Sequence, residues 1–309
     1  MSLAVGQGLR PRVRPEIPLV LVAFVWGATF VLVKRALDDV STLLFLAIRF
    51  SLAAVCLALM LGVKARAAED WKRDLRGGVL AGVCLFTGYV LQTLGLEYTT
   101  PSKAGFITGM YIPLVPVIGA MLYRKMPRWI EAVGIVAAGV GMTLMTLPGS
   151  EARINRGDML VAGCAVAYAM HILVLGHFTP RGNVSFLAVT QIATAAVLSL
   201  GVCGWAEPVR WRSTPAVWIA VGVTSVLATA VAFALQTWAQ RYTSATRTAL
   251  IFALEPVFAW LTSFALLGEL LTRRATLGAG LILAGIVAVE WKQEEALPEE
   301  RLHEPAGLH

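Results

Sequence analysis

The chain has 309 residues, of which 57% are hydrophobic and only 15% are charged, with a formal net charge of +7. A soluble domain carries roughly 45–50% apolar and about 25% charged residues, so this composition excludes an ordinary soluble globule and indicates that lipid is the solvent. The Lys and Arg residues flank apolar runs and do not form one basic face, which excludes nucleic acid as a partner.

Apolar runs long enough to cross about 30 Å of hydrocarbon, which takes about 20 residues each, follow one another along almost the whole chain. They are expected near 17–35, 42–63, 77–96, 101–123, 129–147, 157–176, 184–205, 215–239, 244–267 and 273–290. The longest polar link, 64–76, is too short for a domain and is typical of an interfacial segment. We therefore expect an all-α integral membrane protein with ten transmembrane helices.

Basic residues in the polar segments predict the orientation. Lys and Arg are most frequent in the N-terminal tail and in the 64–76 loop, and such residues favour the cytoplasmic side of short loops. We expect cytoplasmic tails at 1–16 and 291–309. The N-terminal region lacks a small-residue cleavage site after its apolar run, so it is interpreted as an uncleaved first span. Short loops and compact tails are typical of a bacterial plasma membrane protein.

One stretch of the sequence occurs twice. Residues 91–107 read LQTLGLEYTTPSKAGFI and residues 235–251 read LQTWAQRYTSATRTALI, with six identities in seventeen positions at an offset of 144. The same offset relates two glycine pairs, Gly134 with Gly278 and Gly141 with Gly285. This pattern predicts two five-helix repeats, 17–147 and 157–290. An odd number of spans inverts the second repeat, an architecture that many transporters use, with the substrate site between the halves.

Several motifs carry a resemblance to a known family. They are WGATF at Trp26 to Phe30, FLAIRF around Arg49, the segment EPVFAWLTSFALLGELLT that begins at Glu255, and the glycine-rich GIVAAGVGM and GAGLILAGI. With these motifs the chain resembles the EamA-type branch of the drug/metabolite transporter superfamily. The resemblance implies a ten-helix carrier whose central cavity is walled by helices 1–4 and 6–9, with helices 5 and 10 outside. It also implies export of amino acids, metabolites or drugs.

Two ionisable residues lie deep inside predicted spans, where a charge is costly and is a functional hypothesis by default. Glu255 precedes Pro256 near the middle of its span and is the candidate for proton coupling. Its alternatives are a cap on a broken helix or an ion pair with Arg49. Arg49 is a candidate ligand for a substrate carboxylate, and its alternatives are a structural pair or snorkelling to the interface. Tyr111 aligns with Glu255 in the first repeat.

Polar and aromatic residues within the spans are the remaining cavity candidates, because an amide or a phenol in hydrocarbon needs partners. Gln92 and Gln236 occupy matched positions of the two repeats. The other cavity candidates are Trp26, Thr29, Tyr89, Tyr111, Tyr168, His171, Gln191 and Trp238. His171 has the simpler alternative of a hydrogen-bonded packing residue.

Lys103 and Arg247 occupy matched positions in the first turns of two spans, behind the hydroxyl residues Thr100 and Ser244. A helix N-terminus with a cation attracts anions, so the pair is a candidate for gates or mouths, with lipid phosphate as the alternative partner. The glycines of the fifth and tenth spans predict close helix contact within the chain or in a homodimer. The four cysteines show no CxxC spacing, so neither a metal nor another cofactor is indicated.

These features favour a membrane transporter that moves a small-molecule substrate such as an amino acid, by alternating access and in the export direction, with protons as the candidate coupling ion. An uncoupled facilitator or a channel is the alternative. A membrane-embedded enzyme is a remote one, because the chain has no HExxH or GxSxG motif, and we expect no catalytic residues.

Overall fold

The computed structural model describes residues 13–65, 70–99, 101–124, 126–146, 155–204, 207–267 and 273–302. Within these ranges the chain is helical, apart from turns and one isolated bridge between Val40 and Trp211. The first half contributes α1 (Glu16–Ala36), α2 (Thr42–Ala65), α3 (Trp71–Leu96), α4 (Pro101–Thr108), α5 (Tyr111–Tyr123) and α6 (Trp129–Thr146). The second half contributes α7 (Arg156–Phe178), η1 (Thr179–Arg181), α8 (Val184–Val202), α9 (Pro215–Ser225), η2 (Val226–Val231), α10 (Ala232–Ala239), α11 (Ala245–Phe252), α12 (Glu255–Leu267) and α13 (Arg273–Leu302).

The helices form a bundle, and several of them are long enough to span a membrane. Among the described residues, the segments long and apolar enough to cross a bilayer are Thr42–Leu61, Trp71–Leu96, Ala104–Tyr123, Arg156–Arg181, Val184–Val202 and Pro215–Ala239. Glu16–Thr29 and Trp129–Met145 are shorter apolar helices. These segments fit a multi-pass integral membrane protein, and the count of ten spans stays a prediction.

The spans predicted at 101–123 and 244–267 are both broken helices, as their prolines predicted. The α-helical hydrogen-bond pattern is interrupted between α4 and α5 at Gly109–Met110, and between α11 and α12 at Ala253–Leu254, where the N–H groups of Met110 and Ala253 donate to carbonyls three residues earlier. The four bounds of the first pair of helices, shifted by 144 residues, coincide with those of the second pair. Pro256 stands in the first turn of α12, where its missing N–H leaves no hydrogen bond unmade. The carboxylate of Glu255 therefore belongs to a helix start in the middle of the bundle.

The segment from α9 to α10 contains a π-helix, η2, whereas α3, which corresponds to it at the same offset, is continuous. The Oγ1 of Thr229 donates to the carbonyl of Thr224, five residues earlier, at 2.8 Å. Single-turn π-helices release backbone groups from the regular α-helical pattern and are frequent at functional sites. The two halves of the chain differ at this point.

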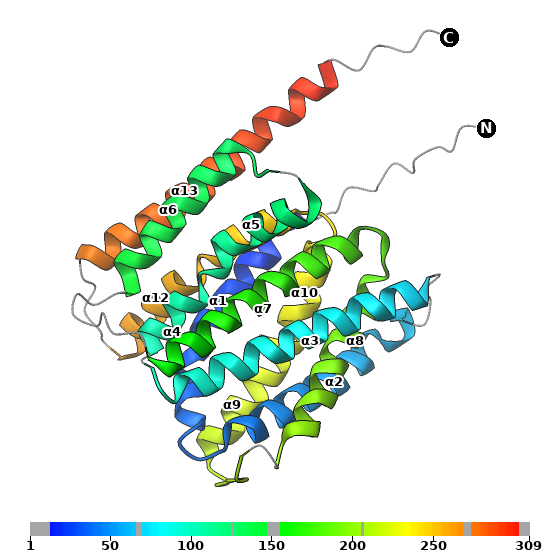
Figure 1. Cartoon of the computed structure of the whole chain (residues 1–309), viewed down its shortest axis with the longest axis vertical. Helices are drawn as coiled ribbons and strands as arrows, with labels where there is room; N and C mark the ends of the chain where they lie inside the picture. Colours follow the sequence, from blue (N-terminus) through cyan, green and yellow to red (C-terminus); the bar gives the residue numbers. More distant parts are fainter. Residues whose placement is uncertain are drawn as a thin grey trace.

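Helices α6 and α13 lie side by side along one edge of the bundle (Figure 1). Two glycine pairs make this contact. A Cβ added at Gly134 would lie 3.1 Å from the carbonyl oxygen of Gly285, and one at Gly141 would lie 2.5 Å from that of Gly278. Residue numbers rise along α6 where they fall along α13, so the two helices are antiparallel. The predicted close contact within the chain is confirmed.

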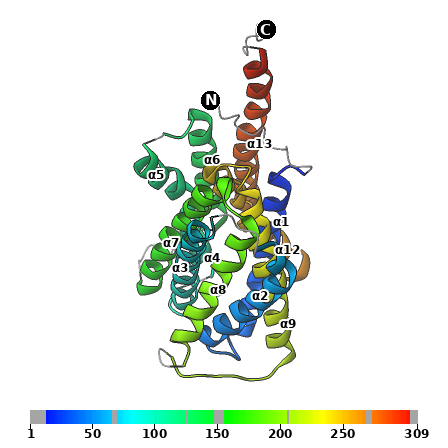
Figure 2. The same cartoon turned by 90° about the vertical axis from the view of Figure 1, so that its right-hand side faces the viewer.

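The bundle has two distinct ends, which Figure 2 shows at top and bottom. At the terminal end α1 begins and α13 ends, and there Arg247 of α11 pairs with Glu16 at 3.0 Å. At the opposite end the α1–α2 turn contacts the α8–α9 connection, because the N–H of Ser41 donates to the carbonyl of Arg210 at 2.9 Å.

Candidate functional site

A cavity of about 910 Å³ occupies the centre of the bundle. Its lining residues come from α1, α2, α3, α4, α5, α7, α10, α11 and α12, and none of those that the structure describes comes from α6 or α13. At the opposite end the cavity reaches the turns of the bundle, through Asp38, Glu97, Thr99, Glu207 and Arg210. Within the described ranges, none of the lining residues comes from the turns of the terminal end. The cavity is therefore open at one end of the molecule.

Arg49 is buried in the wall of this cavity, with 4% of its surface exposed. Its Nε donates to the Oγ1 of Thr229 at 2.7 Å, and its Nη2 donates to the hydroxyl of Tyr89 at 3.0 Å. The Nη2 also reaches the carbonyl of Ala228 at 3.4 Å. Within the described residues the Nη1 group donates to nothing, so a guanidinium held in place by the protein keeps donors for a ligand.

Trp26 of the WGATF motif joins Arg49 at the π-helix. Its indole Nε1 donates to the carbonyl of Ala228 at 2.9 Å, and its ring packs on Phe233 and Phe252 with centroids 5.3 and 5.0 Å apart. Two motif residues of the first half thus donate to the same backbone oxygen in the second half. A buried carbonyl without a partner is costly, so these donors stabilise the π-helix.

Glu255 lines the cavity at the start of α12. The backbone of α1 approaches closely here, because a Cβ added at Gly27 would lie 2.6 Å from the carbonyl oxygen of Glu255. The alternative of an ion pair with Arg49 is not formed in this structure, because among the described residues the Glu255 carboxylate makes neither an ion pair nor a hydrogen bond. The fold instead places both ionisable groups separately on the wall of one cavity.

Tyrosine and glutamine side chains of the cavity wall are connected to one another next to Arg49. The rings of Tyr89 and Tyr168 meet edge to face with centroids 5.7 Å apart. The hydroxyl of Tyr168 donates to the Oε1 of Gln92 at 3.3 Å, and the Nε2 of Gln92 donates to the Oγ1 of Thr108 at 3.1 Å. This bonding fixes the orientation of polar groups that face the cavity.

The structure places two of the predicted cavity residues elsewhere. Gln191 is fully buried and bridges His171 and Thr237, through contacts of 2.8 Å on each side. Only His171 of these three lines the cavity. Trp238 packs on Tyr242 and does not line the cavity either. Gln191 was misplaced because its partners, and not the cavity, satisfy its amide.

The other cavity candidates lie where the sequence placed them, on the cavity wall: Trp26, Thr29, Arg49, Tyr89, Gln92, Tyr111, Tyr168, His171, Gln236 and Glu255. Of the two mouth candidates, Arg247 pairs with Glu16 at the terminal end. Lys103 belongs to the first turn of α4, and its side chain lies outside the described part of the structure.

Sequence reasoning overlooked the charged rim of the cavity. Asp38, Glu97, Glu207 and Arg210 lie in turns or at helix ends, where a charge is ordinarily solvated and carries no signal. Glu207 accepts a hydrogen bond from the N–H of Leu43, so it also fastens the α8–α9 connection to the start of α2. Only the fold brings these residues together at one opening.

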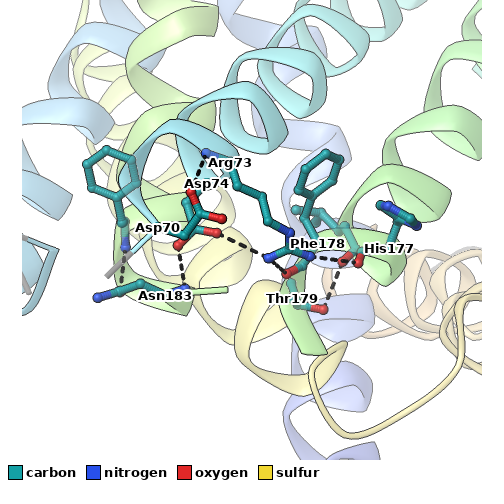
Figure 3. Close-up of polar contacts among 9 residues, drawn as sticks. Asp70, Arg73, Asp74, His177, Phe178, Thr179 and Asn183 are labelled. Atoms are coloured by element: carbon teal, nitrogen blue, oxygen red, sulfur yellow. Dashed lines mark hydrogen bonds and ion pairs between the residues drawn. The ribbon is translucent and has the colours of Figure 1, made fainter. Parts of the chain in front are cut away.

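Polar contacts join α3 to the α7–α8 turn at the terminal end (Figure 3). The carboxylate of Asp74, 4% exposed, pairs with Arg73 at 3.5 Å and accepts from the N–H of Asn183 at 2.8 Å. The guanidinium of Arg73 reaches the carbonyls of His177 and Phe178, each at 3.5 Å. These contacts hold the start of α3 against the α7–α8 turn at the terminal end.

Comparison with known proteins gives a consistent result. The EamA-like transporter family matches residues 15–147 and again residues 155–291. An uncharacterized transporter of Archaeoglobus fulgidus is 34% identical over 90% of this chain and 86% of its own length. The uncharacterized inner membrane transporter YedA of Escherichia coli is 21% identical over 90% and 92% of the two chains. A solved crystal structure at 19% identity has a TM-score of 0.72 over 93% of this chain and 98% of that chain.

Proposed function

Because the chain belongs to the EamA-like transporter family of the drug/metabolite transporter superfamily, we propose that it is a carrier of small zwitterionic metabolites such as amino acids. In this proposal the solute binds in the central cavity, and the protein exposes that cavity to the two sides of the membrane in turn. Transport proceeds in the export direction.

The observation that carries the proposal is the separation of charge on one cavity wall. Arg49 keeps its Nη1 donors, and Glu255 has no partner among the described residues, although both line the same cavity. A guanidinium binds a carboxylate by charge-assisted hydrogen bonds, and a carboxylate binds an ammonium group in the same way. An amino acid carries both groups, so it neutralises both charges at once. The aromatic side chains of Tyr89 and Trp26 offer apolar surface to its side chain.

The repeat supports alternating access. We propose that residues 17–147 and 157–290 form two five-helix repeats with ten spans in all, inverted relative to each other in the membrane. The antiparallel α6–α13 contact fits this inversion, because Gly134 meets Gly285 and its repeat equivalent Gly278 meets Gly141. With both termini in the cytoplasm of a bacterial cell, the cavity described here is open to the outside.

The test is efflux of radiolabelled amino acids from proteoliposomes, with and without a pH gradient, for the wild-type protein and for Glu255→Gln. We expect saturable efflux from the wild type and, if protons couple at this residue, efflux by Glu255→Gln that no longer responds to the gradient. The matched control is Glu97→Gln, which removes a carboxylate from the rim of the same cavity.

Flux that grows linearly with concentration and never saturates would replace the carrier with the facilitator or channel. Saturable transport of other solutes, with no amino acid moved, would keep the carrier and reject the zwitterion. Normal pH-dependent efflux by Glu255→Gln would assign that carboxylate a structural role.

A further inference from the structure

A second, smaller cavity of about 360 Å³ lies at the terminal end of the bundle. It is bounded by the α10–α11 turn, by Pro180 in the α7–α8 connection and by Arg128 and Glu131 at the start of α6. One glutamine pair separates it from the central cavity. Gln236 lines the central cavity, Gln240 lines the small one, and the Nε2 of Gln236 donates to the Oε1 of Gln240 at 3.0 Å.

The repeat relates this small cavity to the open mouth of the large one. Shifted back by 144 residues, Gln240, Arg241 and Thr243 fall on Leu96, Glu97 and Thr99. The first three line the small cavity at the terminal end, and the second three line the opening at the opposite end. In a protein built from inverted repeats, equivalent positions have equivalent roles in the two states. The small cavity thus lies where the repeat predicts a second opening, equivalent to the opening of the central cavity.

Contacts between the α10–α11 turn and the last turns of α7 close the path between the two cavities. Gln240 is fully buried; its Nε2 donates to the carbonyl of Ile172 at 2.9 Å, and its own carbonyl accepts from the Oγ1 of Thr179 at 2.9 Å. A Cβ added at Gly176 would lie 3.3 Å from the Cβ of Ala245, so the start of α11 rests directly on α7. At the opposite end the equivalent residues, Leu96, Glu97 and Thr99, line the central cavity instead.

Not every polar atom at this closed end has a hydrogen-bond partner. The Oε1 of Gln236 is buried and has no hydrogen-bond partner within the described residues. A buried acceptor without a partner destabilises the state that contains it. The glutamine pair therefore holds the terminal end shut by a small number of hydrogen bonds and leaves one buried amide oxygen unsatisfied.

From these observations we propose that Gln236 and Gln240, with Thr179 and the carbonyl of Ile172, are the gate of the transport path at the terminal end. The small cavity beyond them is the second mouth of that path, and three arginines, Arg128, Arg241 and Arg247, lie around it. The inference rests on the proposed carrier function. In the terminal-end-open state the α10–α11 turn separates from α7 and joins the two cavities.

The gate is tested by thiol accessibility, which needs no substrate. A reporter, Thr93→Cys, is placed on the wall of the central cavity in a chain whose four cysteines, Cys56, Cys84, Cys164 and Cys203, are replaced by serine. A membrane-impermeant methanethiosulfonate reagent is added to one side at a time. We expect rapid labelling from the opposite end and slow labelling from the terminal end.

Gln240→Leu installs the side chain that the first repeat carries at this position and removes two hydrogen bonds. Each bond shifts an opening equilibrium by about two- to tenfold, so terminal-end labelling should accelerate about tenfold or more. Gln191→Leu is the matched control, because it also removes two contacts of a fully buried glutamine but lines neither cavity. Thr179→Val, a milder change that keeps the side-chain volume, should give a smaller acceleration.

Labelling in both gate variants at the rate of Gln191→Leu, with the reporter still reacting from the opposite end, would overturn the gate. Equal labelling of the parent from both ends would show that the terminal end is not closed there. If Gln240→Leu does not fold, Thr179→Val decides alone. A failure of amino-acid efflux would reject the proposed function without touching this result, because labelling measures access and not transport.

Discussion

Removing the hydrogen bond between Arg49 and the π-helix residue Thr229 distinguishes a structural role of this arginine from a role in substrate binding. Thr229→Val removes the hydroxyl that accepts from the Nε at 2.7 Å and itself donates to the carbonyl of Thr224 at 2.8 Å. The valine has nearly the same volume, so packing is kept. The variant leaves a buried guanidinium N–H without its partner, while the Nη1 donors, to which we assign the solute carboxylate, remain.

The expected magnitude follows from the bonds that are lost. Removing one partner of a buried hydrogen bond costs about 1–3 kcal/mol, at the upper end when the group left unpaired is charged. We expect Thr229→Val to lower the free energy of unfolding by about 2 kcal/mol and to leave the KM for transport within about twofold of the wild type. Arg49→Lys should lower stability by a similar amount and raise the KM at least tenfold, because an ammonium lacks the planar fork of donors.

The assay combines unfolding in detergent, followed by tryptophan fluorescence, with transport kinetics in proteoliposomes. Thr262→Val is the control, because the hydroxyl of Thr262 donates only to the carbonyl of Phe258 in its own helix at 2.7 Å. If Thr229→Val is as stable as this control, the π-helix does not depend on Arg49. If Arg49→Lys changes stability alone and keeps the wild-type KM, the arginine is structural and does not bind the solute.

Three further predictions concern packing, charge and symmetry. Gly141→Val should destabilise the protein by about 1–3 kcal/mol through overpacking of the α6–α13 contact, whereas Gly139→Val, at a position with open space around it, should leave the detergent melting temperature unchanged; equal effects would contradict the glycine contact. Glu16→Gln should cost less than about 1 kcal/mol, because its ion pair with Arg247 is partly exposed, and the difference from wild type should shrink in high salt. Leu96→Gln gives the first repeat the glutamine of the gate, so it should slow thiol labelling of the central cavity from the opposite end; unchanged labelling would show that the glutamine alone does not close a mouth.

Composition and the repeat predicted the parts of the fold that depend on hydrophobic length and on proline. The broken helices before Tyr111 and Glu255 were predictable, because a proline in mid-span removes a backbone hydrogen bond. The glycines of the fifth and tenth spans predicted close helix contact, within the chain or in a homodimer, and the structure shows that α6 and α13 make it with each other. These features need no knowledge of which side chains meet across the bundle.

The π-helix could not be predicted, because its irregular hydrogen bonds depend on donors from other helices. The carbonyl of Ala228 is satisfied by Trp26 and Arg49, which lie about 180 or more residues earlier in the chain. Gln191 shows the same limit: the sequence indicates that a buried amide needs a partner, but not that the partner is His171. Gln240 was overlooked, because a glutamine at the end of a span is ordinarily solvated, and only the fold brings α7 over it.

The two halves share a backbone plan and differ in side chains along the proposed path. Identical inverted halves would give the two open states equal free energy, so neither end would be preferred. The breaks between α4 and α5 and between α11 and α12 coincide at the repeat offset. The side chains differ: at this offset Glu255 aligns with Tyr111, Gln240 with Leu96 and Arg241 with Glu97. Under the proposed mechanism, these differences between the halves, together with the π-helix, make the state that is open at the opposite end the more stable one. The resting state is then adjustable by single side chains at the mouths, while the helices that move remain the same in both directions.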